Sequence, residues 1–127
     1  MTVLYVTDNI NMYCKYESKL KEIANVEQCC FERFEQISSY DILIVEFDKN
    51  KVQARNYEII RSAMCKMKDS PILALLENSS VLDQFEVLTM GALDFVEIPF
   101  GEDILINKMN DFFRWKWYYE WEKKHEN

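Results

Sequence analysis

The residue best placed for chemistry is a glutamate that ends an apolar run. Residues 42–45 are all isoleucine, leucine or valine, and Glu46 follows them directly. A run this apolar is typical of a parallel strand with both faces covered by helices. Open α/β sheets hold their ligands outside the carboxyl ends of such strands. We therefore expect Glu46 to lie at the edge of a sheet where a site would form.

A second carboxylate stands in the same kind of place. Asp8 follows the β-prone run 3–6 and Thr7. Carboxylate oxygens bind Mg²⁺, but the ion demands near-octahedral oxygen coordination. Asp8 and Glu46 alone therefore predict a magnesium site that is weak at best, and no other cofactor is expected.

Other catalytic or metal chemistry has little support in the sequence. The chain has one histidine, His125 near its end, and four cysteines without a CxxC pair, Cys14, Cys29, Cys30 and Cys65. A zinc site needs clustered thiolates and imidazoles. A nucleophile activated by histidine needs that histidine on an ordered element rather than in a frayed end. We expect four reduced thiols in a cytoplasmic protein that is not an enzyme.

Composition sets the broad class. The chain has 127 residues, 49% of them hydrophobic and 29% charged, which is typical of one globular domain covering 1–127. The net charge of -7 argues against nucleic-acid binding through this domain. No apolar run approaches the ~20 residues of a membrane span, and no basic-then-apolar export signal begins the chain, so no membrane role is expected.

Strand and helix patterns alternate along the whole chain. The expected strands are 3–6, 26–30, 42–46, 72–76 and 94–97. The expected helices are 12–23, a short one over 31–37, one that follows a polar loop at 48–53 and bears 57–67, one over 81–90, and a long one over about 102–125. Ser80 is a candidate helix cap and Gly91 a candidate helix stop. Such alternation predicts an α/β, doubly wound parallel sheet.

Several segments resemble one family. They are 4–9 (LYVTDN), 40–46 (YDILIVE), 70–76 (SPILALL) and 91–100 (GALDFVEIPF), the last with the most specific spacing. With these segments the chain resembles the receiver domain of two-component response regulators over nearly its full length. The resemblance implies a flavodoxin-like, five-stranded sheet in the order 2-1-3-4-5, with an extended last helix.

The resemblance also implies where a phosphoryl site would be. A competent receiver accepts a phosphoryl group on an aspartate after strand three, beside two magnesium-binding acids after strand one, a hydroxyl after strand four and a lysine after strand five. Such transfer depends on positioning and charge neutralisation. The five positions fall on Thr7, Asp8, Glu46, Leu76 and Ile98. Only Asp8 keeps the family's residue type. Leu76 and Ile98 are expected to form an apolar lid beside Glu46.

This degeneracy predicts a phosphorylation-independent signalling module that acts by protein–protein contact or dimerisation. An output domain beyond these residues, such as a transcription factor, is one expected target. Glu46 has two interpretations, a permanent imitation of a phosphorylated aspartate or a tolerated polar residue. Asp48 is a further candidate phosphoacceptor, although its side chain is expected to point elsewhere. A flavodoxin-like cofactor binder is the alternative function, but the segment 7–11 lacks the glycine of a phosphate loop.

The end of the chain is aromatic. Residues 112–121 contain seven aromatic side chains, including every tryptophan. A stripe at helical spacing is expected to pack on the sheet or on a neighbour, and consists of Ile106, Met109, Phe113, Trp117 and Trp121. Leu105, Phe112, Trp115 and Tyr119 would then lie on other faces.

So wide an aromatic surface usually marks an interface. We expect Phe113, Trp117 and Trp121, together with Phe95 on the last strand, to contact a partner or to pack as fixed core residues. A homodimer or partner protein held by the last helix, a connector to an output domain, and a helix folded back over the monomer all remain open.

Overall fold

The computed structural model describes residues 1–126 and contains one five-stranded parallel sheet. The strands are β1 (Thr2–Val6), β2 (Asn25–Cys29), β3 (Ile42–Phe47), β4 (Ile72–Glu77) and β5 (Asp94–Ile98). Their order is β2-β1-β3-β4-β5, and every adjacent pair is parallel. The predicted class, strand number and strand order are therefore confirmed.

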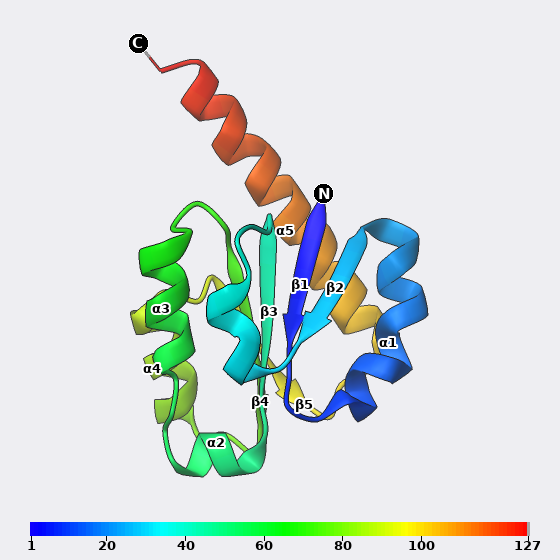
Figure 1. Ribbon diagram of the computed structural model, residues 1–127, viewed down its shortest axis with the longest axis vertical. Coiled ribbons are helices and arrows are strands. Elements are labelled where there is room, and N and C mark those ends of the chain that lie inside the picture. The colour runs from blue at the N-terminus through cyan, green and yellow to red at the C-terminus, as the bar shows by residue number, and fades with distance from the viewer. Residues whose placement is uncertain (127) are drawn as a thin grey trace.

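Helices cover both faces of the sheet (Figure 1). They are α1 (Ile10–Ile23), the 3-10 helix η1 (Phe31–Gln36), α2 (Lys49–Gln53), α3 (Glu58–Lys66), α4 (Val81–Met90) and α5 (Glu102–Lys124). The core on one side of the sheet includes side chains of α1 and α5, and we call it the α1–α5 side. The core on the other side includes side chains of η1, α2, α3 and α4, and we call it the α3–α4 side.

Strand β3 shows why the central run is so apolar. Ile42 and Ile44 lie in the core of the α1–α5 side, whereas Leu43, Val45 and Phe47 lie in that of the α3–α4 side. All of them are fully buried. Because successive side chains of a strand point to opposite faces, Glu46 has the orientation of Ile44.

Two local signals in the sequence are confirmed. Ser80 and Asp83 form a capping box at the start of α4, which satisfies backbone N–H groups of its first turn. Gly91 ends this helix with a φ of 132°. A Cβ atom there would lie 2.6 Å from Cγ of Met64, so both conformation and space favour glycine.

The segment predicted as a polar loop forms the short helix α2. The side chain of Asp48 accepts a hydrogen bond from the Lys51 backbone N–H at 2.9 Å and caps this helix. Val52 is buried in the core of the α3–α4 side. One cap and one buried side chain stabilise this helix. The helix is too short to show a helical periodicity in the sequence, so it was not predicted.

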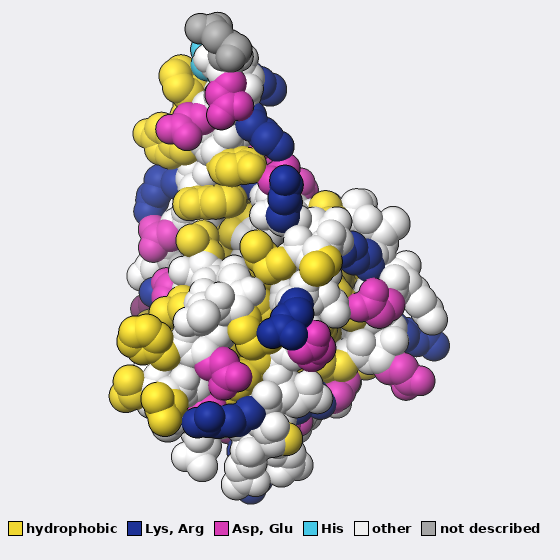
Figure 2. All heavy atoms as spheres, turned by 90° about the vertical axis from the view of Figure 1, so that its left-hand side faces the viewer, with side chains coloured by type: hydrophobic (Ala, Val, Ile, Leu, Met, Phe, Trp, Pro, Cys, Tyr) yellow, Lys and Arg dark blue, Asp and Glu magenta, His cyan; other side chains and the backbone are white. Residues whose placement is uncertain are grey.

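Helix α5 packs with a face that matches the predicted stripe only in part. Its buried residues are Leu105, Met109, Phe112 and Lys116, so the prediction holds for Met109, whereas the placement of Leu105 and Phe112 on other faces was wrong. Ile106 and Phe113 of the stripe are half-buried against the same core. The sheet ends before the helix does, so α5 projects beyond it (Figure 1). We call residues 117–124 the α5 extension. Figure 2 shows hydrophobic side chains along this projecting part and over α4.

One loop residue holds the base of the extension. Asp69, between α3 and β4, accepts hydrogen bonds from three α5 side chains. Nζ of Lys116 donates to its backbone oxygen at 2.9 Å, and Tyr119 and Lys123 donate to its carboxylate at 2.7 and 2.6 Å. One face of α5 is thus tied to its own domain. Among residues 1–126, no helix is long and apolar enough to cross a membrane.

Candidate functional site

The strand-end site consists of Thr7, Asp8, Glu46, Leu76 and Ile98, at the carboxyl ends of β1, β3, β4 and β5. Glu46 is the buried acid of this set, with 5% of its surface exposed. Its Oε1 accepts a hydrogen bond from the phenol of Tyr5 at 2.7 Å. Tyr5 lies in the core of the α1–α5 side, and its ring contacts that of Tyr13 at a centroid distance of 5.1 Å. The carboxylate is therefore directed into the domain.

Burial governs the protonation of this pair. Loss of solvent raises the pKa of Glu46 above its ordinary value, although the hydrogen bond from Tyr5 acts in the opposite direction. Burial, and then the neighbouring Glu46 carboxylate, raise the pKa of Tyr5 far above its ordinary value. The phenol therefore keeps its proton and serves as the donor that a buried carboxylate needs.

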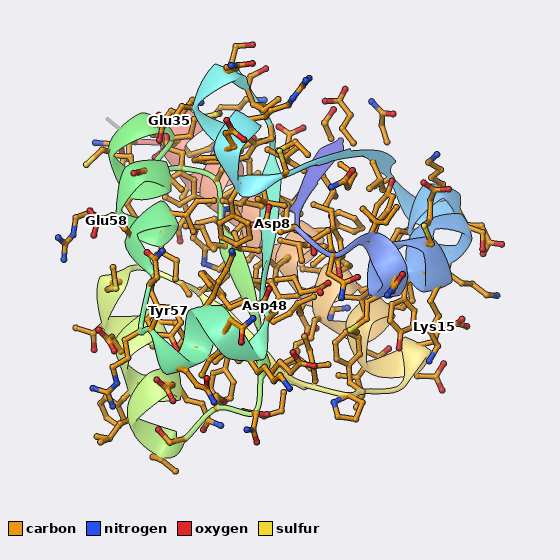
Figure 3. All side chains as sticks on the ribbon, turned by 60° about the horizontal axis from the view of Figure 1, so that its bottom comes forward. Asp8, Lys15, Glu35, Asp48, Tyr57 and Glu58 are labelled. Carbon is orange, nitrogen blue, oxygen red and sulfur yellow. The ribbon has the colours of Figure 1, made fainter. Side chains whose placement is uncertain are left out.

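Asp8 is also engaged by protein groups. Figure 3 labels it at the carboxyl-end edge of the sheet, which is turned toward the viewer. Its Oδ1 accepts the backbone N–H of Phe31 at 3.0 Å, and its Oδ2 lies 2.8 Å from Nζ of Lys51. Partial burial acts to raise the pKa of Asp8, but the hydrogen bonds from Lys51 and Phe31 outweigh it and the pKa lies below its ordinary value. Asp8 is a carboxylate with an ammonium already in contact.

Besides Glu46, the three other substituted positions differ in their surroundings. The Thr7 hydroxyl donates to the carbonyl oxygen of Asn9 at 2.8 Å and accepts from its N–H at 3.0 Å. Leu76 is fully buried in the core of the α3–α4 side, whereas Ile98 packs against that of the α1–α5 side. The joint apolar lid of Leu76 and Ile98 was therefore a wrong prediction, because the two side chains lie on opposite faces of the sheet.

These donors do not fit a magnesium ion. Both oxygens of Asp8 and one of Glu46 already have protein partners. The described residues contain no group of three or more acidic, histidine or cysteine side chains able to hold a metal. Asp48 caps α2, and Glu77 accepts the backbone N–H of Lys49 at 2.8 Å. The carboxylates of these two neighbouring acids thus already accept hydrogen bonds from backbone N–H groups.

The sequence did not identify the two side chains that pair with the acids of the site, the hydrogen-bond donor Tyr5 and the cation Lys51. Tyr5 is the one residue with a polar tip in the run 3–6, which is the signal that could have marked it. Lys51 stands in a segment with further lysines and carried no signal of its own. The phosphoacceptor candidate Asp48 does point elsewhere, since its carboxylate caps α2.

The four predicted interface residues fall into two groups. Phe95 and Phe113 are half-buried and pack against the cores of opposite sides of the sheet. Trp117 and Trp121 are 57% and 47% exposed on the α5 extension. A further exposed apolar set lies on α4, and sequence analysis did not identify it as a surface: Val81, Leu82, Phe85 and Leu88.

Comparison with known proteins places the fold among receiver domains. No protein-family model and no curated protein sequence matches the chain. NtrX from Brucella abortus, solved in complex with ADP, aligns with 97% of this chain at a TM-score of 0.81 and 12% identity. The receiver domain of a LuxO repressor protein from Vibrio parahaemolyticus aligns with 99% at 0.80 and 17%.

A CheY-like response regulator from Mesorhizobium loti aligns with 87% of this chain at a TM-score of 0.70 and 17% identity. The present chain spans 28% of the NtrX chain, and 97% of each of the LuxO and CheY-like chains. At these identities the comparison establishes the fold: a parallel five-stranded sheet flanked by helices, as in response-regulator receiver domains.

Proposed function

We propose that the protein is a receiver-like module of two-component signal transduction that acts by protein contact and without phosphorylation. The single observation that carries this proposal is the inward pairing of the strand-end acids. Glu46 is bonded to Tyr5, and Asp8 to Lys51. A phosphoacceptor must present a free carboxylate oxygen beside a metal and donors that stabilise the transferred group. The receiver fold of NtrX, LuxO and the CheY-like protein supports the signalling role.

The contact surface that we propose is the α5 extension, with a second copy of this chain as the partner. Trp117, Tyr118 and Trp121 expose aromatic surface that the domain itself does not cover. Residues 111–126 hold four basic and four acidic residues, so the net charge of -7 resides in the rest of the chain. Two extensions can approach without the repulsion that two acidic bodies would experience.

A connection to an output domain is compatible with the same helix. The alignments with NtrX and LuxO cover 97% and 99% of this chain, so they include nearly all of α5. The NtrX chain extends well beyond the matched region. We propose that α5 transmits contact or dimerisation to whatever domain it is joined to.

The interpretation of Glu46 as a phosphate imitation is weaker than the tolerated-residue interpretation. Its charge is buried and held by Tyr5, so it offers little to a surface that would read it. A Glu46→Gln variant separates the two: we expect the oligomeric state and the output to be those of the wild type. Loss of either would favour the imitation.

The proposed independence from phosphorylation is tested with a small phosphoryl donor. The purified protein is incubated with acetyl phosphate and Mg²⁺, beside a competent receiver as the positive control, and both are followed by intact-mass measurement and light scattering. We expect the control to gain a phosphoryl group while this protein keeps its mass and its oligomeric state. A phosphoryl adduct on Glu46, Asp48 or Asp8 that changes the oligomeric state would overturn the proposal.

A further inference from the structure

We propose that the ammonium of Lys51 is the resident cation of the strand-end site, held at Asp8 by helix α2 and excluding divalent cations from it. This inference deepens the proposed function, and rests on it for the meaning of the site. The magnesium ion that the fold family would place here does not fit the donors present. The ion pair supplies a positive charge at the same carboxylate.

The ammonium has contacts on two sides. Nζ of Lys51 lies 2.8 Å from Oδ2 of Asp8 and 4.4 Å from the centroid of the Phe31 ring. A carboxylate and an aromatic face both attract a cation. The two side chains of the pair are only 21% and 39% exposed, so solvent screens the pair less than an ordinary surface ion pair.

Helix α2 fixes the place of this ammonium. Asp48 caps the helix, and Val52 anchors it in the core of the α3–α4 side. The backbone N–H of Lys49 donates to Glu77 at the end of β4. Because the helix is held at both its start and its buried face, the backbone of Lys51 is fixed within reach of Asp8.

An entering divalent cation would meet two obstacles at Asp8. It would have to displace the ammonium from Oδ2, while Oδ1 stays bonded to the N–H of Phe31. It would then sit beside the displaced positive charge, while one oxygen of Glu46 stays bonded to Tyr5. The structure of this edge is therefore independent of divalent cations, in keeping with a module that needs no phosphoryl chemistry.

The test compares Mn²⁺ binding by the wild type, Lys51→Met and Lys49→Met. Lys49 is on the same helix, and its exposed side chain makes the variant a matched control. Site-specific paramagnetic broadening of backbone amide signals in NMR spectra reports the ion. We expect Lys51→Met alone to show saturable broadening at Asp8, Asn9 and Phe31. Its affinity should exceed the upper limit that the wild-type titration sets by at least about tenfold, since removal of one neighbouring charge relieves repulsion even in water.

Two results would overturn the proposal. One is saturable broadening at Asp8 in the wild type, with Lys51 in place. The other is a Lys51→Met variant, folded by circular dichroism, that binds Mn²⁺ no better than Lys49→Met. Lys51→Gln repeats the titration if the methionine variant does not fold. Adding Asp8→Ala to Lys51→Met should abolish the broadening, which fixes the site.

The Mn²⁺ titration and the acetyl phosphate experiment can fail independently of each other. The Mn²⁺ titration contains no phosphoryl donor, so a negative result leaves the acetyl phosphate experiment to be judged by itself. A phosphoryl adduct on the wild type would overturn the proposed function while the resident-cation result stood.

Discussion

The strand-end site and the α5 extension differ in whether their side chains find partners within the domain. At the strand ends, buried or half-buried charges are satisfied inside the domain: Tyr5 donates to Glu46, and Lys51 pairs with Asp8. On the extension, Trp117 and Trp121 leave about half of their surface in solvent. The acids of the first region have partners within the domain, whereas the aromatic side chains of the second are exposed to solvent.

This difference separates two properties of the domain, its stability and its capacity for contact with a partner. Internal pairing occupies both oxygens of Asp8 and one oxygen of Glu46, and at the same time it stabilises the edge of the sheet. Exposed aromatic surface adds little to the stability of an isolated domain, and its use is in association. The account therefore assigns stability to the strand ends and contact to α5, and each assignment can be broken separately.

The largest expected effect is on association. Trp117→Glu combined with Trp121→Glu should raise the dimer dissociation constant by about 30-fold or more, since buried interface tryptophans commonly contribute ~2 kcal/mol or more. Light scattering over a concentration series measures this. Ile23→Glu on α1, outside the proposed contact, is the control and should leave the dimer intact. A double variant that stays dimeric would move the interface away from α5.

The next effect is on stability at the strand ends. Tyr5→Phe removes the donor of Glu46 and should lower the free energy of unfolding by about 1–3 kcal/mol, the usual cost of leaving a buried acceptor without its partner. Denaturant unfolding measures it. Tyr118→Phe on the exposed extension should change stability by less than about 0.5 kcal/mol. Equal effects of the two variants would contradict the contrast between the regions.

A smaller effect is the pH dependence of Glu46→Gln. Burial raises the folded pKa of Glu46 above its ordinary value of 4.5. The folded state then holds this proton to higher pH than the unfolded state, so stability is lost as pH rises from 4.5 through the folded pKa. Glutamine has no such proton. The stability of the variant relative to the wild type should therefore improve as pH rises through this window, in chemical unfolding at several pH values. A constant difference would argue against a raised pKa.

The smallest effect is local. Asp69→Asn removes the charge that accepts hydrogen bonds from Tyr119 and Lys123, while the backbone contact with Lys116 remains. We expect faster amide hydrogen exchange over residues 117–124 with little change in the melting temperature. Asp111→Asn, which loses only a pair with Arg114 within the same helix, is the control. Unchanged exchange in the Asp69 variant would show that packing alone holds the extension.

The fold followed from the sequence where a local pattern had a unique physical meaning. The apolar run 42–45 can be buried on both faces only in a covered parallel strand, and Ser80 and Gly91 carry the chemistry of a helix start and stop. Such signals depend on neighbours in the chain. They fixed the class, and the resemblance to receivers supplied the strand order.

The remainder depends on contacts between distant residues. Tyr5 and Glu46 are 41 residues apart, and Asp8 meets Lys51 only because α2 forms where a loop was predicted. The predicted buried face of α5 was right only in part, at Met109, because aromatic residues lie all round this helix and spacing alone could not select the face that meets the sheet. Trp117 and Trp121 are exposed because α5 projects beyond the sheet. No local pattern in the sequence encodes the length of that projection.

The central claim is that the acids at the strand ends serve the domain's own structure and not phosphoryl chemistry. It is tested most directly by an NMR titration with Mg²⁺ and beryllofluoride, which together imitate a bound phosphoryl group. We predict no saturable shifts in the backbone amide signals around Asp8 and Glu46, because Lys51 and Phe31 hold both oxygens of Asp8 and Tyr5 holds one oxygen of Glu46. Large, saturable shifts at these two residues would contradict it.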